Sequence, residues 1–236
     1  MQNVPESNDL GTFFSCMAPK AKSMKTRNIA IIIFCFFCGA ALIATLHIRS
    51  KISGRSLELQ WKETLDDLDT HSSAAHIQSL RYDSYARQAA TENDHTRQKL
   101  FLALAHSERI HEQMCKHATE LFGGNYSAPY AGADLSTTTA ENLRRSIDSA
   151  RTRHNAFNGI ATTRAIESGN RYVARILIWI DGCNRRHIEL LEHAYDSLTT
   201  STGYLVCPKC GNTYHTESYD RYCPFCQTHH SDFKRF

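Results

Sequence analysis

Four cysteines near the carboxyl end form the strongest chemical motif of the sequence. Cys207 and Cys210 make one C-x-x-C pair, and after twelve intervening residues Cys223 and Cys226 make a second. Such pairs are typical of metal knuckles, each of which directs two sulfurs at one ion, and two knuckles form a tetrahedral four-thiolate site. The segment 203–236 is too short to be stabilised by apolar burial alone, so we expect a bound metal to supply folding energy. Iron and zinc both suit this site, and two disulfides are the alternative.

A second group of polar residues follows helical spacing in the middle of the chain. Glu108 and His111 lie one turn apart on one helix face, so both could reach a single metal. The polar residues expected at this level are Glu108, His111, Arg151, His154, Asn184 and His187. Burying several polar groups together is costly unless they pair or bind metal. This level is therefore predicted to be either a metal site or a hydrogen-bonded polar layer.

The polar residues of the second group need helices to position them, and the spacing of apolar residues along the sequence predicts four helices. From Trp61 to Ala89, apolar and small residues recur at steps of four and three, and the same spacing returns in three later segments. The predicted stops are Asn93, Gly123 and Gly169, and Thr138 with Glu141 forms a capping box that begins the third helix. The two helix pairs look like copies offset by 76 residues. We therefore predict a four-helix bundle over residues 57–202, made of two helical hairpins joined by a long connection.

The bundle and its tail together resemble the rubrerythrin family over roughly residues 57–236. The residues that carry the resemblance are Glu108, His111 and His187 in the bundle and the spacing of the four cysteines. It implies a mainly α fold, with a ferritin-like four-helix bundle followed by a small rubredoxin-like or zinc-ribbon module at 203–236. It also implies an iron in four thiolates that passes electrons to a di-iron centre for peroxide reduction. A homodimer and an electron-donor protein are the partners that the family suggests.

The sequence departs from the di-iron pattern of that family at four positions. Ala75 stands where the first Glu belongs, Arg151 and His154 replace the Glu pair of the third helix, and Asn184 replaces the Glu of the fourth. Two iron ions need several anionic oxygen ligands, so a conventional di-iron centre is not expected.

The remaining residues leave three possibilities for the bundle, and no catalytic residue is assigned. Glu108, His111, His154 and His187 could hold a single iron, manganese or zinc ion, with Arg151 and Asn184 around it. Alternatively, Arg151 pairs with Glu108 in a metal-free core, or a degenerate two-metal site persists. The corresponding functions are a peroxide-reducing electron-transfer enzyme and a non-catalytic scaffold with a structural zinc knuckle. Metal sensing or storage is a third possibility.

An uncharged apolar run precedes the bundle. The eighteen residues from Ile29 to Leu46 would span about 27 Å as a helix, close to the thickness of a bilayer core. We predict a single-pass anchor at 29–48, with a cytoplasmic segment at 1–28 and a polar linker at 50–56. The soluble domain is expected on the extracytoplasmic side. A cleaved signal peptide is the alternative, and residues 1–23 could precede the true start at Met24.

The distribution of charge argues against nucleic acid as a partner. Residues 1–57 carry seven Lys and Arg against two acidic residues, whereas the remaining 179 residues carry 20 basic against 22 acidic. A nucleic-acid-binding protein needs a basic working domain, and here the basic excess surrounds the apolar run instead.

Overall fold

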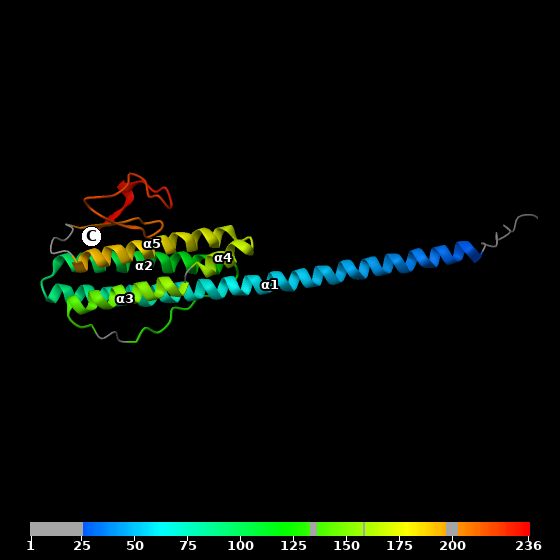
Figure 1. Ribbon diagram of the computed structural model, residues 1–236, viewed down its shortest axis with the longest axis horizontal. Coiled ribbons are helices and arrows are strands. Elements are labelled where there is room, and N and C mark those ends of the chain that lie inside the picture. The colour runs from blue at the N-terminus through cyan, green and yellow to red at the C-terminus, as the bar shows by residue number, and fades with distance from the viewer. Residues whose placement is uncertain (1–25, 133–135, 158, 197–202) are drawn as a thin grey trace, which may run out of the picture. The chain divides into compact units, whose positions relative to one another are not determined.

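The computed structural model describes residues 26–132, 136–157, 159–196 and 203–236. By its contacts the chain divides between Ser53 and Gly54 into two compact units. The second unit contains a helical bundle and a small module of short strands, and both candidate sites lie in it (Figure 1).

The first helix is longer than the sequence predicts. Helix α1 runs without a break from Thr26 to Thr91, so the predicted polar linker at 50–56 is wrong. Ser, Gly and charged residues in that stretch do not interrupt the helix because helix propensity is only a weak local preference. The predicted segment 1–28 lies almost wholly outside the described residues.

The apolar run predicted as an anchor lies inside the first part of α1. Over the part of the chain that the structure describes, no helix has a stretch long and apolar enough to cross a membrane. The structure therefore does not confirm the anchor at 29–48, which stays a prediction.

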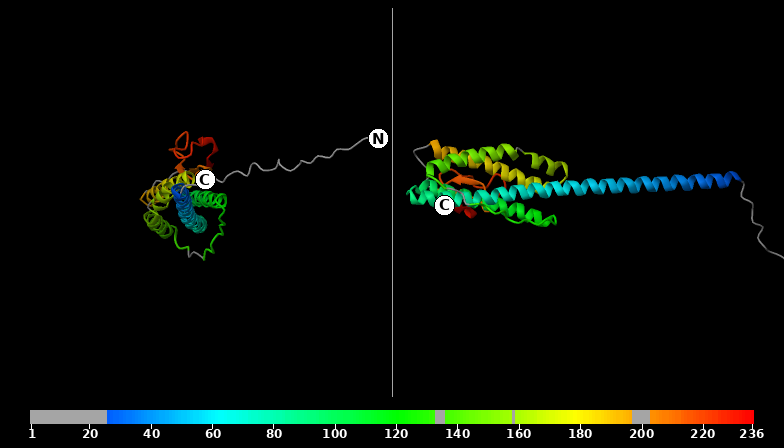
Figure 2. Two further views of the ribbon diagram at one scale, coloured as in Figure 1. Left: turned by 90° about the vertical axis from the view of Figure 1, so that its right-hand side faces the viewer. Right: turned by 90° about the horizontal axis from the view of Figure 1, so that it is seen from below.

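The helices of the bundle pack as two hairpins, as predicted. Helix α2 spans His95–Leu121 and α5 spans Arg171–Asp196, and Figure 2 shows them with α3 beside the carboxyl part of α1. Asn93, at φ +59°, and Gly169, at φ +75°, adopt the left-handed conformation predicted for the two hairpin turns. The amide of Glu141 donates to Thr138 Oγ1 over 3.3 Å, which confirms the predicted capping start.

The third predicted helix is in fact two helices. Helix α3 ends at Phe157, Gly159 follows at φ +70°, and α4 runs only from Ile160 to Glu167. The sequence contains the signal for this break, since Asn158-Gly159 is a dipeptide typical of turns. The single helix predicted from 138 to 169 is therefore wrong in its middle.

The core follows the predicted stripes except on α3 and at Trp61 of α1, which is 42% exposed. The predicted inward residues of the second and fourth helices are buried, except that Phe122 is half-buried and Leu198 lies outside the described residues. The buried ones are Phe101, Leu104, Glu108, His111, Cys115, Ala118, Val173, Leu177, Ile180, Asn184, His187, Leu191 and Ala194. On α3, Leu143 and Ile147 are buried as predicted, but Ala150 takes the next inward place and Arg151 is exposed. The steps from Leu143 to Ile147 and from Ile147 to Arg151 are both four residues long, and together they rotate the inward direction by about 80° around the helix. A step of three after Ile147 rotates that direction back and keeps Ala150 on the buried face.

The carboxyl-terminal module is a small antiparallel sheet around the cysteines. Strands β1 (Tyr204–Val206), β2 (Thr213–His215) and β3 (Lys234–Arg235) form a sheet in the order β2-β1-β3. Tyr204 and Val206 belong to the same apolar cluster as residues of α1, α2, α3 and α5. The core of the bundle therefore continues into the module, which lies against α2 and α5.

Candidate functional site

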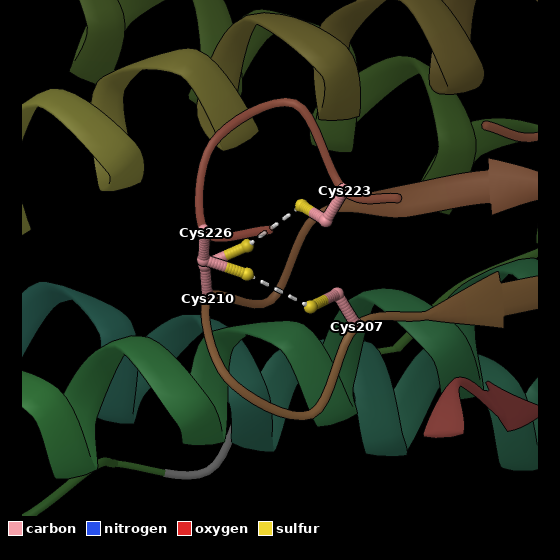
Figure 3. A group of neighbouring side chains, drawn as sticks. All are labelled: Cys207, Cys210, Cys223 and Cys226. Atoms are coloured by element: carbon pink, nitrogen blue, oxygen red, sulfur yellow. Dashed lines mark hydrogen bonds between the residues drawn. The ribbon is translucent and has the colours of Figure 1, made fainter. Parts of the chain in front are cut away.

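The four predicted cysteines converge on one point, as Figure 3 shows. Cys207 Sγ lies 3.4 Å from Cys226 Sγ, and Cys210 Sγ lies 3.4 Å from Cys223 Sγ. All four are free thiols, so the disulfide alternative is not realised. Four thiolates bonded at about 2.3 Å to one tetrahedral ion would stand about 3.8 Å apart, which a small expansion of this cluster provides.

The two knuckles have the same backbone design. In the first, Gly211 N–H donates to Cys207 O over 3.0 Å, and in the second, Gln227 N–H donates to Cys223 O over 2.9 Å. Gly211, at φ +80°, and Gln227, at φ +62°, are both left-handed. A non-glycine residue is therefore accommodated in the second knuckle, and the glycine of the first has another cause.

That cause is the contact between the first knuckle and the bundle. A Cβ atom on Gly211 would lie 2.7 Å from His111 Nε2 and 2.9 Å from Ser107 Oγ. The hydroxyl of Ser107 donates to Gly211 O over 2.6 Å, and His111 Nε2 donates to Cys210 O over 3.2 Å. The Cys183 thiol donates to the same carbonyl over 3.3 Å. Side chains of α2 and α5 therefore hold the backbone of the first knuckle directly.

The second knuckle contacts the bundle through an aromatic ring. Phe225 packs so closely on α5 that a Cβ on Gly182 would lie 2.5 Å from its Cζ. Trp179 of α5 and Phe225 both pack against the apolar cluster that contains the four cysteines. Each of these two knuckle contacts requires a glycine, Gly211 in the first and Gly182 in the second.

The knuckle contacts favour one tautomer for each of two buried histidines. His111 Nε2 lies 3.2 Å from the Cys210 carbonyl, which only accepts, whereas Nδ1 has the longer contact with Glu108, so we assign the proton of the neutral ring to Nε2. Because Ser107 gives its proton to Gly211 O, its oxygen accepts from His187 Nε2, 2.9 Å away. In their neutral forms both imidazoles then present an Nδ1 lone pair to the same carboxylate. His111 Nδ1 lies 3.4 Å from Glu108 Oε2, and His187 Nδ1 lies 3.5 Å from Glu108 Oε1.

A buried arginine completes this group. Arg153 Nη2 lies 2.8 Å from Glu108 Oε1, and the two side chains are 9% and 2% exposed. Burial alone would raise the pKa of Glu108, but the charge of the adjacent Arg153 is the main cause that holds that pKa well below its ordinary value. Burial lowers the pKa of His187, which keeps its imidazole neutral. Glu108 is therefore an ionised carboxylate whose charge is balanced by Arg153.

The structure brings together three of the four predicted bundle residues, namely Glu108, His111 and His187. His154 lies elsewhere, with its Nδ1 3.2 Å from Asp181 Oδ1. His154 and the buried Asn184 line a separate small cavity of about 10 Å³.

The predicted role of Arg151 needs correction. It is exposed and pairs with Glu192 across 2.7 Å, so the arginine that faces Glu108 is Arg153. Arg151 points away from the core because the buried residue after Ile147 is Ala150, three residues on, rather than the residue four positions on. Sequence reasoning also missed Ser107, which carries no metal-ligand signature and lies beside the stripe rather than on it.

The two sites differ in how well they suit a metal. The four cysteines are the only group of three or more His, Cys, Asp or Glu side chains, among residues that the structure describes, whose donor atoms all lie within 4.8 Å of one another. Buried thiols in this arrangement suit iron or zinc. The bundle group does not suit a di-iron centre, because Glu108 is its one carboxylate and already pairs with a guanidinium.

Comparisons with known proteins agree with this architecture. The family model described as Rubrerythrin matches residues 77–195, half of the chain. Nigerythrin in its mixed-valent state superposes with a TM-score of 0.67 at 20% identity, covering 73% of this chain and 86% of that one. Fully reduced, all-ferrous nigerythrin gives a TM-score of 0.67 at 21% identity with the same coverage. At such identities the likeness shows the fold alone, and a comparison with curated protein sequences gave no match.

The family match and the fold agree on the order of the two parts, a helical bundle followed by a four-cysteine module. The matched segment contains Glu108, His111 and His187, and the four-thiolate cluster follows it as a rubredoxin-like module. The chain belongs to the rubrerythrin family.

Proposed function

We propose that this protein works as a four-thiolate metal protein, in which a single iron or zinc ion occupies the knuckles and the bundle serves as their rigid platform. The observation that carries the proposal is the convergence of Cys207, Cys210, Cys223 and Cys226, none of which is more than 7% exposed. Iron would make the site a one-electron carrier, and zinc would make it structural. The similar nigerythrin, whose fully reduced state is all-ferrous, supports iron here.

Peroxide reduction at the bundle is the second candidate. The observation in its favour is that His111, His187 and Glu108 lie together next to the first knuckle. His111 hydrogen-bonds to the Cys210 carbonyl, and Ser107 links His187 to Gly211. The observation against it is the ion pair of Glu108 with Arg153, which takes the place of an anionic ligand set. We therefore favour the electron carrier or structural metal over an enzyme with a metal in the bundle.

Anchoring to a membrane through residues 29–48, with the soluble domain outside the cytoplasm, is part of the proposal. Its support is the uncharged apolar run between flanking basic residues. Resistance of the full chain to alkaline extraction from membranes would support the anchor, and release into the soluble fraction would contradict it. A donor protein and a homodimer also remain proposals.

The metal proposal is tested by elemental analysis of the full chain purified without oxygen. We expect one metal per chain in the wild type and none in Cys207→Ser or Cys223→Ser. Iron gives an intense visible charge-transfer spectrum in its ferric form, whereas zinc leaves the protein colourless. Wild-type protein that holds no iron or zinc under these conditions would contradict the proposal.

The enzyme candidate has its own measurement. Peroxide consumption with a chemical reductant is compared in the wild type, Glu108→Gln and His187→Gln. Turnover that is lost in both variants, with the four-thiolate metal retained, would establish catalysis in the bundle. Turnover that is absent from the wild type, or equal in all three proteins, would exclude it.

A further inference from the structure

We propose that Arg153 is the resident cation of the bundle centre and that its guanidinium bars a metal ion from Glu108, His111 and His187. The proposal is independent of what the four thiolates bind. It concerns the carboxylate of Glu108 and the two imidazoles that face it.

The first step is the orientation of the donor atoms. The contacts with Ser107 and Cys210 favour the tautomers of His187 and His111 that carry the proton on Nε2, so in each neutral imidazole the lone pair is on Nδ1, which faces Glu108. Both Nδ1 atoms lie within 3.5 Å of an oxygen of Glu108. His187 Nδ1 is buried and has no hydrogen-bond partner among the residues described. Two imidazoles and one carboxylate are a ligand set typical of Fe²⁺, and they suit Zn²⁺ as well.

The second step is the position of the guanidinium. Arg153 Nη2 lies 2.8 Å from Glu108 Oε1. A metal bound to that oxygen would have to lie about 2.1 Å from it, in space that the guanidinium now occupies. The arginine cannot lose its charge at any ordinary pH, so it both occupies the space and repels a second cation. A buried carboxylate needs one positive partner, and Arg153 already supplies it.

The third step is the fit between the arginine and its surroundings. Nε and Nη1 of Arg153 are buried without a hydrogen-bond partner in the described part of the chain. The guanidinium is thus held by Glu108 and Tyr82 rather than by a full set of acceptors. Its removal would leave Glu108, His111 and His187 with no cation among them.

The experiment counts metals in the full chain after anaerobic incubation with excess Fe²⁺ or Zn²⁺ and gel filtration. The wild type is expected to hold only the four-thiolate ion, and Arg153→Gln is expected to gain one further metal per chain. Adding His187→Gln to Arg153→Gln should remove the gained metal. Arg151→Gln is the matched control, because this exposed arginine lies two residues away and pairs with Glu192. It should leave the count unchanged.

A folded Arg153→Gln protein, judged by circular dichroism, that gains no metal would overturn the proposal. A titration of the wild type with Co²⁺ needs no variant and tests the same point. Saturation after the thiolate site supports the proposal, whereas a second cobalt site that is lost in His187→Gln overturns it. If the thiolates held no metal at all, the gain of one ion in Arg153→Gln would still be measurable, so the two proposals can fail separately.

Discussion

The hydroxyl of Ser107 on α2 donates a 2.6 Å hydrogen bond to the carbonyl of Gly211, the residue that closes the first metal knuckle. The same hydroxyl accepts from His187 on α5, so one serine joins two bundle helices to the module. A short, buried hydrogen bond of this kind has no competing water, and its loss would leave a buried carbonyl without a partner. The knuckle and the bundle are therefore expected to unfold together.

Gly211→Ala should uncouple the module from the bundle. The left-handed backbone alone costs an alanine about 1–2 kcal/mol, and its Cβ would also meet His111 and Ser107. We expect a lower urea midpoint and faster amide hydrogen exchange in β1 and β2. Gln227→Ala is the control, because it keeps a left-handed non-glycine residue in the other knuckle and should change stability by less than about 0.5 kcal/mol. Equal effects of the two variants would contradict the role of the contact.

Cys210→Ser and Cys183→Ser should separate a metal ligand from a neighbouring thiol. Cys210 belongs to the four-thiolate cluster, whereas Cys183 only donates to the Cys210 carbonyl. We expect Cys210→Ser to lose most of the bound metal and Cys183→Ser to keep it, since a serine hydroxyl can donate to the same carbonyl. Elemental analysis measures both. Loss of the metal in Cys183→Ser would show that the fifth cysteine is itself a ligand.

Replacing only one member of the Glu108–Arg153 pair should be costly. Arg153→Met leaves a buried carboxylate without its counter-charge, for which we expect a loss of about 3–5 kcal/mol in the free energy of unfolding. The double variant Arg153→Met with Glu108→Leu should recover much of that loss. Urea unfolding of protein that carries one zinc ion, without excess metal, measures the cycle. Additive losses in the double variant would mean that the two side chains do not act as a pair.

His71 should make the bundle sensitive to acid. Burial lowers the pKa of His71 to about 4, whereas in the unfolded chain it is near 6.5. Between these values the unfolded state binds the proton and the folded state does not. The contribution of neutral His71 to the free energy of unfolding is therefore fully present above pH 6.5. It falls as the pH drops towards 4, by up to about 1.4 kcal/mol per pH unit.

The measurement is the free energy of unfolding from pH 7 to 4 in the wild type and His71→Gln. The variant should show a shallower decline. His95→Gln, at an exposed position on α2, is the control and should follow the wild type. All three proteins share any loss of thiolate metal in acid, so the difference between the curves isolates His71. Parallel curves for the wild type and His71→Gln would contradict the prediction.

Much of the bundle could be predicted from the sequence because its apolar stripes repeat with helical spacing. The stops at Asn93 and Gly169 were predictable as well, since each combines a break in the stripe with a residue that tolerates positive φ. The four-thiolate cluster followed from spacing alone. Periodicity is a strong signal where a residue pattern extends over several turns.

The bundle site was harder to predict because its decisive residue depends on helix phase. Arg151 and Arg153 are both arginines of α3, and only the step after Ile147 decides which one faces Glu108. The break at Gly159 removed the downstream residues that would have fixed that phase. The position of the module could not be predicted either. Gly182 and Gly211 mark two of its contacts, but a glycine in a sequence does not say which side chain approaches it.

The four cysteines of the metal site are unequally exposed, so solvent can reach the site from one side. Cys207, Cys210 and Cys223 are fully buried, and only Cys226 reaches the surface, with 7% of its area exposed. A chelator, an oxidant or a proton from solvent can therefore approach through one ligand first. We expect metal release to be a sequential process whose rate is set by detachment of the Cys226 thiolate. The thiolates of the first knuckle, which Ser107 and His111 hold in place, should detach last.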